Sequence, residues 1–326
     1  MEDYRMTFIS TYGNITCREV TGRTREEEKD LRASYTVKQS VKNAQNQDKK
    51  KQNYYRLVNG RPAGGQLQSW RDSEWLEPSG FFLLDYDLFE KGKDGMLIRK
   101  KMTATDVWNR MKSHTKEWGI VHAEKSARGG LHVTLIRTEG LSIEENIRLM
   151  ELRTGVGFDP SCKDLARACF LVPNEYIFFE TDTYYEDSIP QPLTLSAADA
   201  ERLEKDRLER EQQHQQEVEE RRKNAPTLRC EAGTDEAVQL RYVIDLIHQQ
   251  GVDLTCQYHN WIVIGLIIAN IMGMEGEPLF HQVSSLYPRY DWMETHRKYR
   301  ELASRSRGEV TLGTLIYLSR NEGVVN

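Results

Sequence analysis

The chain has 326 residues, with 45 Lys and Arg against 50 Asp and Glu, and a formal net charge of −5. This length is enough for about two domains, and the acidic balance excludes an overall positive field that would attract a polyanion from a distance. The longest apolar run, Trp261–Ala269, is shorter than the ~20 residues that a membrane helix needs, so we expect no membrane span. The few cysteines and a start that lacks the basic-then-apolar order of a secretory signal favour a cytoplasmic protein.

The first part of the chain predicts both strands and helices. Met6–Tyr12 is rich in β-branched and aromatic residues, as strands are. Val37–Lys51 is polar and ends in three lysines, which indicates either a solvated segment or a basic arm that touches phosphates. Gly80–Phe89 contains an apolar run typical of a buried strand, and the run stops at two aspartates. Thr103–Ser113 has a Thr cap and apolar residues at helical spacing.

The next segment predicts a hairpin, a helix and further strands. Gly119–Ala123 and Leu131–Ile136 flank a polar stretch that contains glycine, which is typical of a hairpin. A capping box at Ser142 predicts a helix that runs to about Thr154. Residues 168–172 and 176–179 predict two more strands. We therefore expect an α+β domain with mixed elements around an extended sheet.

The second half of the chain predicts helices alone. Residues 196–223 contain neither Gly nor Pro and are dense in charged side chains, which predicts a long solvated helix that ends at Ala225-Pro226. Helical runs at 237–250, 260–272 and 310–319 then indicate a compact all-α domain. The predicted organisation is a catalytic-type α+β domain over 1–195, a charged helical linker over 196–228 and an all-α domain over 229–326.

Asp85 and Asp87 are the first candidates for chemistry. One residue separates them, so on a strand both side chains point to the same side of the sheet. Two adjacent carboxylates repel each other, and a divalent cation such as Mg²⁺ or Mn²⁺ relieves that repulsion while it also clamps phosphate oxygens. An Asp-x-Asp in a turn is also a common capping device, so the pair alone leaves both interpretations open.

The polar stretch of the predicted hairpin supplies a second group of candidates. A glycine-bearing turn that carries Lys125, Ser126 and Arg128 can bring cations and backbone N–H groups to a polyphosphate. His132 opens the following strand, where its ring could donate a hydrogen bond to the same ligand. A single histidine on a strand is also a common structural residue.

A third group follows the predicted helix that ends near Thr154. Asp159 supplies another acid directly after an apolar residue, and Arg167 could neutralise phosphate or hold the acids in place. Asp164 lies close enough along the chain to compete with Asp159 for the role of third acid. An ordinary surface ion pair explains Asp164 and Arg167 equally well.

The order of these groups resembles the three motifs of the archaeo-eukaryotic primase superfamily. Leu84–Asp87 is similar to its hydrophobic-Asp-x-Asp motif, Ser126–His132 to Ser-x-x-Gly-x-x-His with Gly129 as the glycine, and Phe158-Asp159 to hydrophobic-Asp. The region from residue 52 to about 179 also resembles the primase-like N-terminal domain of the virulence-associated E family. The last part of the chain resembles the helical primase C-terminal domain, and the residues that carry this resemblance are Asp253, Trp261, Gly265, Ser284, Tyr290 and Thr311–Leu315.

This resemblance implies a primase or primase-polymerase with an RRM-like sheet core. Such an enzyme joins nucleoside triphosphates on a single-stranded DNA template, and the family implies replication of a mobile genetic element. Asp85, Asp87 and Asp159 would then hold two Mg²⁺ or Mn²⁺ ions, with Asp159 preferred over Asp164 because the motif has an apolar residue directly before its acid. The nucleotide site would comprise Lys125, Ser126, Arg128, Gly129, His132 and Arg167.

Two further patterns concern partners and metals. The aromatic and basic residues Tyr290, Trp292, Arg297, Lys298 and Arg300 could stack on and neutralise a single-stranded template, and domain packing is the alternative. Cys256 and His259 have metal-ligand spacing, but no second pair lies near enough in sequence to complete a zinc site, so we expect a buried thiol and a helix-end histidine.

The sequence also bears on other functional classes. The sequence contains no Gly-x-x-x-x-Gly-Lys-Ser/Thr loop, so unwinding would fall to a separate helicase. A non-catalytic DNA-binding accessory protein for replication or mobilisation is the main alternative, in which the acids serve structure. A nicking relaxase is disfavoured because none of the eight histidines forms a His-x-His pair. The acidic net charge predicts weak, salt-sensitive binding to DNA.

Overall fold

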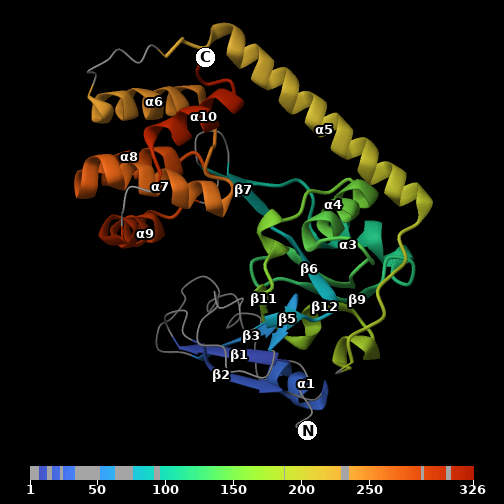
Figure 1. The fold of residues 1–326 in the computed structure, drawn as a ribbon. Coiled ribbons are helices and arrows are strands. Elements are labelled where there is room, and N and C mark those ends of the chain that lie inside the picture. The colour runs from blue at the N-terminus through green and yellow to red at the C-terminus, as the bar shows by residue number, and fades with distance from the viewer. Residues whose placement is uncertain are drawn as a thin grey trace. The chain divides into compact units, whose positions relative to one another are not determined.

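The structure is a computed structural model that describes residues 7–12, 17–22, 25–33, 52–62, 76–91, 96–186, 188–228, 235–287, 290–305 and 310–326. The chain divides into two compact units, Met1–Lys205 and Asp206–Asn326. The first unit contains all the described strands and the second is helical, so the expected α+β class is confirmed (Figure 1). The polar segment Val37–Lys51 lies outside the described residues.

The central sheet of the first unit has the strand order β12-β9-β10-β6, and every pairing is antiparallel. α3 packs against β9 and β10, and α4 packs against β6. These elements were predicted from apolar runs, from the polar stretch that contains glycine, and from the helix caps. Their bounds are Phe81–Tyr86 for β6, Ala104–Met111 for α3, Ile120–Lys125 for β9, Leu131–Ile136 for β10, Ile143–Thr154 for α4 and Ile177–Glu180 for β12.

The strand register separates an apolar face of this sheet from a charged one. Residues directly opposite each other on paired strands point to the same face. Leu84 lies opposite Val133, and both side chains are fully buried in the core of the unit. His132 lies opposite Asp85 on one neighbouring strand and opposite Glu124 on the other. These three polar side chains therefore share the other face.

A second sheet of the first unit has the order β11-β3-β1-β2, again with antiparallel pairings. The strand expected over Met6–Tyr12 is present as β1. The elements are Thr7–Tyr12 for β1, Cys17–Gly22 for β2, Arg25–Ala33 for α1, Gln52–Leu57 for β3 and Ala168–Phe170 for β11. Because β11 begins directly after Arg167, its pairing with β3 positions that arginine.

Two short hairpins complete the strands of the described residues. β4 (Gly60–Pro62) pairs with β5 (Leu76–Pro78), and β7 (Phe89–Lys91) pairs with β8 (Leu97–Arg99). The second hairpin follows the end of β6 almost at once.

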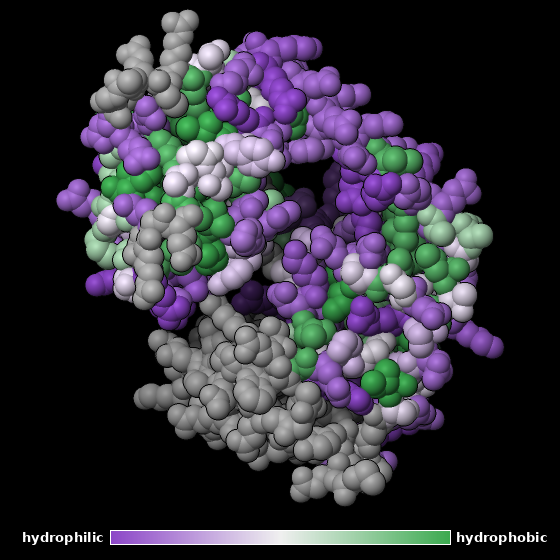
Figure 2. All heavy atoms as spheres, in the orientation of Figure 1, coloured by the Kyte–Doolittle hydropathy of each residue, from purple (hydrophilic) through white to green (hydrophobic). Residues whose placement is uncertain are grey.

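α5 (Ala197–Asn224) is the long solvated helix that the charge run predicted. Its hydrophilic surface can be followed in Figure 2. Its buried positions are Asp199, Asp206 and Val218, and the two compact units divide within it, between Lys205 and Asp206. Each end of the helix therefore belongs to a different unit.

The second unit has its own core, which is built by helices. Its fully buried side chains include Leu240, Ile244, Ile264, Phe280 and Tyr299. Gly265 allows close packing, since a Cβ at this position would lie 2.5 Å from Leu302 Cδ1. The helices are α6 (Glu236–Gln250), α7 (Tyr258–Met272), α8 (Glu277–Ser284), α9 (Trp292–Arg305) and α10 (Leu312–Asn321).

One described segment, Tyr258–Ser284, is long and apolar enough to cross a membrane, with a mean hydropathy of 1.5. The segment comprises α7, a 3₁₀ turn that begins at Gly273, and α8. Ile267 and Phe280 are completely buried within the helical core. Core packing therefore accounts for the apolar character of this segment.

Candidate active site

The charged face of the central sheet begins with a cross-strand pair near the end of β6. Asp85 lies opposite His132, and 3.7 Å separates Asp85 Oδ1 from His132 Nε2. Arg167 Nη2 donates a hydrogen bond of 2.7 Å to Asp85 Oδ2. The carboxylate of Asp85 is therefore held from two sides by cationic or hydrogen-bonding groups.

Asp159 lies beside Asp85, as the three-acid prediction requires. Its backbone N–H donates to the Asp85 carbonyl oxygen at 2.8 Å. Its carboxylate caps the 3₁₀ turn Pro160–Lys163 by accepting from the Ser161 backbone N–H at 2.9 Å and the Ser161 hydroxyl at 3.0 Å. Arg167 Nη2 lies 3.4 Å from Asp159 Oδ2. One guanidinium thus joins both acids.

The alternative third acid lies in a different environment. Asp164 is exposed at the end of the 3₁₀ turn, and its backbone carbonyl accepts hydrogen bonds from Asn59 and Arg167. Arg167 directs its guanidinium to Asp85 and Asp159. The structure therefore brings Asp159 to Asp85, and the ion pair that we considered between Asp164 and Arg167 is not among the described salt bridges.

Asp87 is placed differently from the other two acids. β6 ends at Tyr86, so Asp87 lies just beyond the strand, in an exposed position. The same-side argument for Asp85 and Asp87 assumed a continuous strand and does not extend to this residue. The surrounding chain removes part of its hydration, and together with the negative charge of Asp85 this raises the pKa of Asp87.

A buried thiol completes the group of possible ligands around the two acids. Carboxylate oxygens of Asp85 and Asp159 and the Sγ atom of Cys162 lie within 4.8 Å of one another. The Cys162 side chain is fully buried, and burial raises the pKa of its thiol to about 12. The two carboxylates supply the oxygen atoms that hard divalent cations prefer.

The glycine-bearing turn between β9 and β10 lies against the end of β6. Gly129 has a φ of +90°, a conformation that L side chains rarely adopt. A Cβ at Gly130 would lie 2.1 Å from the carbonyl oxygen of Tyr86. Ser126 closes the turn, because its N–H donates to the Gly130 carbonyl at 2.9 Å. Close backbone packing thus fixes this turn next to the acids.

The other residues expected to contact a nucleotide divide into two sets. His132 and Arg167 lie against the acids. Lys125 Nζ lies 5.3 Å from the centre of the Tyr176 ring, and Arg128 is exposed in the turn. The structure therefore joins only part of the predicted nucleotide set to the carboxylates.

Glu124 is a functional-site candidate that the sequence reasoning missed. Its side chain is 3 % exposed and accepts a hydrogen bond of 2.6 Å from Arg32, and its Oε1 lies 3.5 Å from His132 Nδ1. Burial would raise the pKa of Glu124, but Arg32 and His132 outweigh burial and hold that pKa well below its usual range. The hairpin register, which pairs residues 124 and 132, is the signal that could have revealed it.

His132 therefore lies between two carboxylates. Burial alone would lower the pKa of its imidazole, but Asp85 and Glu124 together raise it above the ordinary value. The face of the sheet thus carries an alternation of acids and cations that runs from Arg32 to Arg167.

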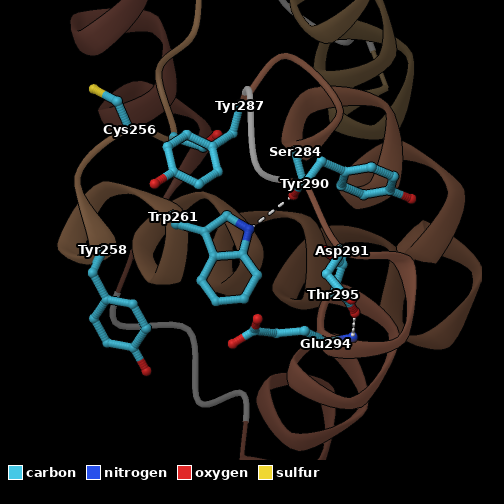
Figure 3. Close-up of a pocket in the computed structure, with 10 residues that line it drawn as sticks. Cys256, Tyr258, Trp261, Ser284, Tyr287, Tyr290, Asp291, Glu294 and Thr295 are labelled. Carbon is cyan, nitrogen blue, oxygen red and sulfur yellow. Dashed lines mark hydrogen bonds between the residues drawn. The ribbon is translucent and has the colours of Figure 1, made fainter. Parts of the chain in front are cut away.

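The second unit contains an aromatic pocket of about 170 Å³ (Figure 3). Trp261 lies in this pocket, and its indole N–H donates to the Ser284 hydroxyl at 2.8 Å. Aromatic walls suit stacking on a planar base, whereas acids disfavour a phosphate. The walls include the aromatic residues Tyr258, Trp261, Tyr287 and Tyr290 and the acids Asp291 and Glu294.

The residues expected to bind a template lie at different positions around this pocket. Tyr290 lines it, and Trp292 is 53 % exposed at the start of α9. Arg297 and Arg300 are exposed and lie three residues apart on α9, so they are neighbours on its surface. Lys298 pairs instead with Glu301 at 2.9 Å. Lys298 Nζ also lies 6.0 Å from the centre of the ring of Tyr258, which lines the pocket.

The spacing of Cys256 and His259 does not produce a metal site in the described part of the chain. Neither residue belongs to any described group of potential metal ligands. Cys256 is exposed beside the aromatic pocket, and His259 is exposed in the first turn of α7. His259 therefore lies at a helix end as we expected, whereas the thiol of Cys256, which we expected to be buried, is exposed.

Comparisons with known proteins concern mainly the helical unit. Residues 243–319 match the family model described as Primase C terminal 2 (PriCT-2), which confirms the expected resemblance of this region. A solved structure titled "Crystal structure of primase RepB'" is similar over 99 % of this chain and 94 % of that chain, with 13 % identity and a TM-score of 0.30. A similarity of this size supports no transfer of residues or mechanism. None of the curated proteins matches.

Proposed function

We propose that this chain is a primase or primase-polymerase that transfers nucleotides on a single-stranded DNA template. One observation carries the proposal: Asp85, His132 and Asp159, which are far apart in sequence, meet at one end of the central sheet beside a glycine-bearing turn. The similarity of residues 243–319 to a primase C-terminal family supports the same function. We assign the activity to replication of a mobile genetic element, with a separate helicase as partner.

The donor atoms at the acids fit a hard divalent cation. Asp85 and Asp159 present carboxylate oxygens within 4.8 Å of each other, and such oxygens are the ligands that Mg²⁺ and Mn²⁺ prefer. We assign both residues to metal binding and Asp87 to a second position at the exposed end of β6. Two such ions, when bound, activate a 3′-hydroxyl and stabilise the departing pyrophosphate.

Arg167 and His132 supply the cationic side of the proposed site. The guanidinium of Arg167 now neutralises Asp85 and Asp159, and a metal ion would compete with it for the same oxygens. We propose that Arg167 would contact the triphosphate as a bidentate donor. An imidazole ring carries at least one N–H, so His132 can donate a hydrogen bond to a phosphate oxygen.

A non-catalytic accessory protein is the second candidate, and one observation favours it. Arg167 already balances Asp85 and Asp159 without any ion, as it would in a purely structural charge network. In that case the fold persists, and the chain binds DNA without synthesis.

The two candidates are separated by one experiment on the full chain. Purified protein is incubated with a single-stranded template, labelled nucleotides and Mg²⁺ or Mn²⁺, with and without a primer. The enzyme proposal expects incorporation by the wild type and its loss in the Asp85→Ala, Asp87→Ala double variant, with DNA binding retained. A wild type that binds DNA but incorporates nothing at any metal concentration supports the accessory protein and refutes the enzyme.

A further inference from the structure

A carboxylate and two imidazoles meet between α8 and α9 of the second unit. Glu277 and His281 are four residues apart on α8, which puts them on one face of the helix, and 3.5 Å separates Glu277 Oε1 from His281 Nε2. His296, on α9, donates from Nδ1 to the same Glu277 oxygen. Ligand-type atoms of the three residues all lie within 4.8 Å of one another.

The hydrogen bonds around His281 leave one of its two ring nitrogens without a partner. Its Nδ1 shares a hydrogen bond of 2.6 Å with the Tyr290 hydroxyl, whereas its Nε2 is buried and has no hydrogen-bond partner. When Nδ1 carries the ring proton and donates it to Tyr290, Nε2 presents a lone pair toward Glu277. A buried ring nitrogen without a partner is unfavourable, so the cluster is incomplete as it stands.

The spacing of the ligand atoms indicates that a metal ion would complete the cluster. A separation of 3.5 Å between His281 Nε2 and Glu277 Oε1 is too long for a good hydrogen bond. It is close to the distance of about 3.3 Å between two ligands of a tetrahedral zinc ion, given metal–ligand bonds of about 2.0–2.1 Å. A simple ion pair between Glu277 and His296 would use one imidazole and leave the other unexplained.

The surroundings support the two imidazoles in the way that metal sites commonly do. Metal-bound histidines usually engage their second ring nitrogen with another polar group, and Tyr290 does this for His281. The Trp292 indole stacks on His281 with an interplanar angle of 17° and on His296 with an angle of 7°. The side chains of Glu277, His281 and His296 are 21 %, 14 % and 27 % exposed, so an ion can reach them from solvent.

We propose that Glu277, His281 and His296 bind one divalent transition-metal ion of the zinc class, with water as the fourth ligand, and that the proton shared by His296 Nδ1 and Glu277 is released to solvent as the ion binds. Two imidazoles and one carboxylate are a common zinc set, whereas Mg²⁺ prefers oxygen ligands alone. The ion links α8 to α9 and holds Tyr290 beside the aromatic pocket. This site is separate from the acids of the first unit and does not depend on the proposed activity.

Zinc binding by the full chain tests the site directly. Zn²⁺ is titrated against the metal-free protein in competition with a chromogenic chelator, and Co²⁺ is used to read the coordination geometry from its visible absorption. We expect one tightly bound ion per chain and a tetrahedral cobalt spectrum. Affinity should fall at least about tenfold in His281→Gln and in His296→Gln, and about 10- to 100-fold in Tyr290→Phe, whose hydroxyl supports His281. His248→Gln, which changes an exposed histidine at the end of α6, is the matched control.

Two further controls accompany the zinc titration. The titration is repeated in the Asp85→Asn, Asp159→Asn chain, where zinc binding should persist because these residues belong to the other site. If a histidine variant fails to fold, judged by circular dichroism, Glu277→Gln replaces it, and the wild-type cobalt spectrum still reports nitrogen and oxygen ligation. The proposal is overturned when the wild type binds no zinc, or when the folded ligand variants bind it as tightly as the His248→Gln control.

Discussion

Arg167 is the residue that keeps two neighbouring carboxylates compatible at the end of the central sheet. Its Nη2 lies 2.7 Å from Asp85 and 3.4 Å from Asp159. Arg167→Gln leaves the two acids to repel each other, and because the site is partly solvated we expect a loss of about 2 kcal/mol in the free energy of unfolding. Thermal unfolding with and without Mg²⁺ checks this. The cation should raise the melting temperature of the variant more than that of the wild type.

The control for this prediction breaks an exposed ion pair. Arg207 lies 3.5 Å from Glu211 on the surface of α5, and Arg207→Gln should change stability by less than about 0.5 kcal/mol. An Arg167→Gln protein that melts like the wild type and does not respond to Mg²⁺ would contradict the assigned role.

His122 makes the stability of the first unit depend on pH. The ring is buried and stacked on Tyr184, with 4.1 Å between the ring centres. Burial lowers the pKa of His122 to about 3, although Glu124 opposes the shift. The unfolded chain therefore binds a proton near pH 6.5 that the folded chain binds only near pH 3. The stabilisation is complete above pH 6.5 and is lost as the pH falls toward 3.

Urea unfolding at pH 7 and pH 5 measures this effect. The wild type should lose about 2 kcal/mol more than His122→Gln between the two pH values, since each pH unit in this window is worth about 1.4 kcal/mol. Titratable groups away from this ring contribute equally to both proteins, and Glu124 is held far below this pH window, so the difference belongs to residue 122. Equal losses in the two proteins would show that the pKa of His122 is the same in the folded and unfolded chains.

The residues of the site were only partly predictable from the sequence. Asp85, His132 and Asp159 could be chosen because each belongs to a local motif, and the structure brings them together. Glu124 and Arg32 could not, because their ion pair joins positions far apart in the chain and no local pattern marks it. The proposal that these residues catalyse a reaction stays a prediction.

Local signals also explain which secondary-structure elements were predicted. α4 was expected from the Ser142 capping box, which is present with the Glu145 side chain returning to the Ser142 N–H. The β9–β10 hairpin was expected because two strand-like segments flank a polar stretch that contains glycine. The pairing of β11 with β3 joins Ala168 to Leu57, and no short-range pattern specifies such a register.

The glycine-bearing turn offers a test at the level of the hairpin. Gly130→Ala introduces a Cβ that would lie 2.1 Å from the Tyr86 carbonyl oxygen, and a backbone atom cannot move aside cheaply. We expect a loss of about 3 kcal/mol in stability, typical of severe overpacking. Chemical unfolding of the purified variant checks it.

Gly157→Ala is the matched control for this hairpin prediction. The nearest atom to a Cβ at position 157 is Glu151 Oε1, at 4.0 Å, which is ordinary contact. Its stability should stay within about 0.5 kcal/mol of the wild type. A Gly130→Ala protein as stable as Gly157→Ala would mean that the turn does not pack against β6 as described.

At the scale of the whole chain, the two compact units divide between Lys205 and Asp206, inside the segment 196–228 that was expected to be a linker. The charge run predicted a spacer over 196–228, yet Asp199 pairs with Arg153 at 2.7 Å within the first unit. At the other end, Arg221 Nε donates to the Glu322 carbonyl at 2.9 Å within the second unit. Hydrophobic patterning cannot reveal attachments made by charged side chains, so a helix of this kind is taken for a free linker.

This division predicts how fragments behave. A fragment of residues 206–326 keeps the buried Val218 and the hydrogen bonds of Pro226 and Leu228 to Asn326, so it should unfold cooperatively. A fragment of residues 229–326 loses these contacts and should melt at a lower temperature. Calorimetry of both fragments tests the prediction. Equal melting temperatures would show that this end of α5 contributes nothing to the helical unit.

The central claim is that Asp85 and Asp159, brought together by the fold, hold a divalent ion for nucleotide transfer. The most direct measurement is incorporation of labelled nucleotides on a single-stranded template across a Mg²⁺ and Mn²⁺ titration, by the wild type, Asp159→Asn and Asp164→Asn. We predict metal-dependent incorporation by the wild type and by Asp164→Asn, whose changed side chain is exposed, and at least a hundredfold loss in Asp159→Asn. Undiminished incorporation by Asp159→Asn would contradict the account.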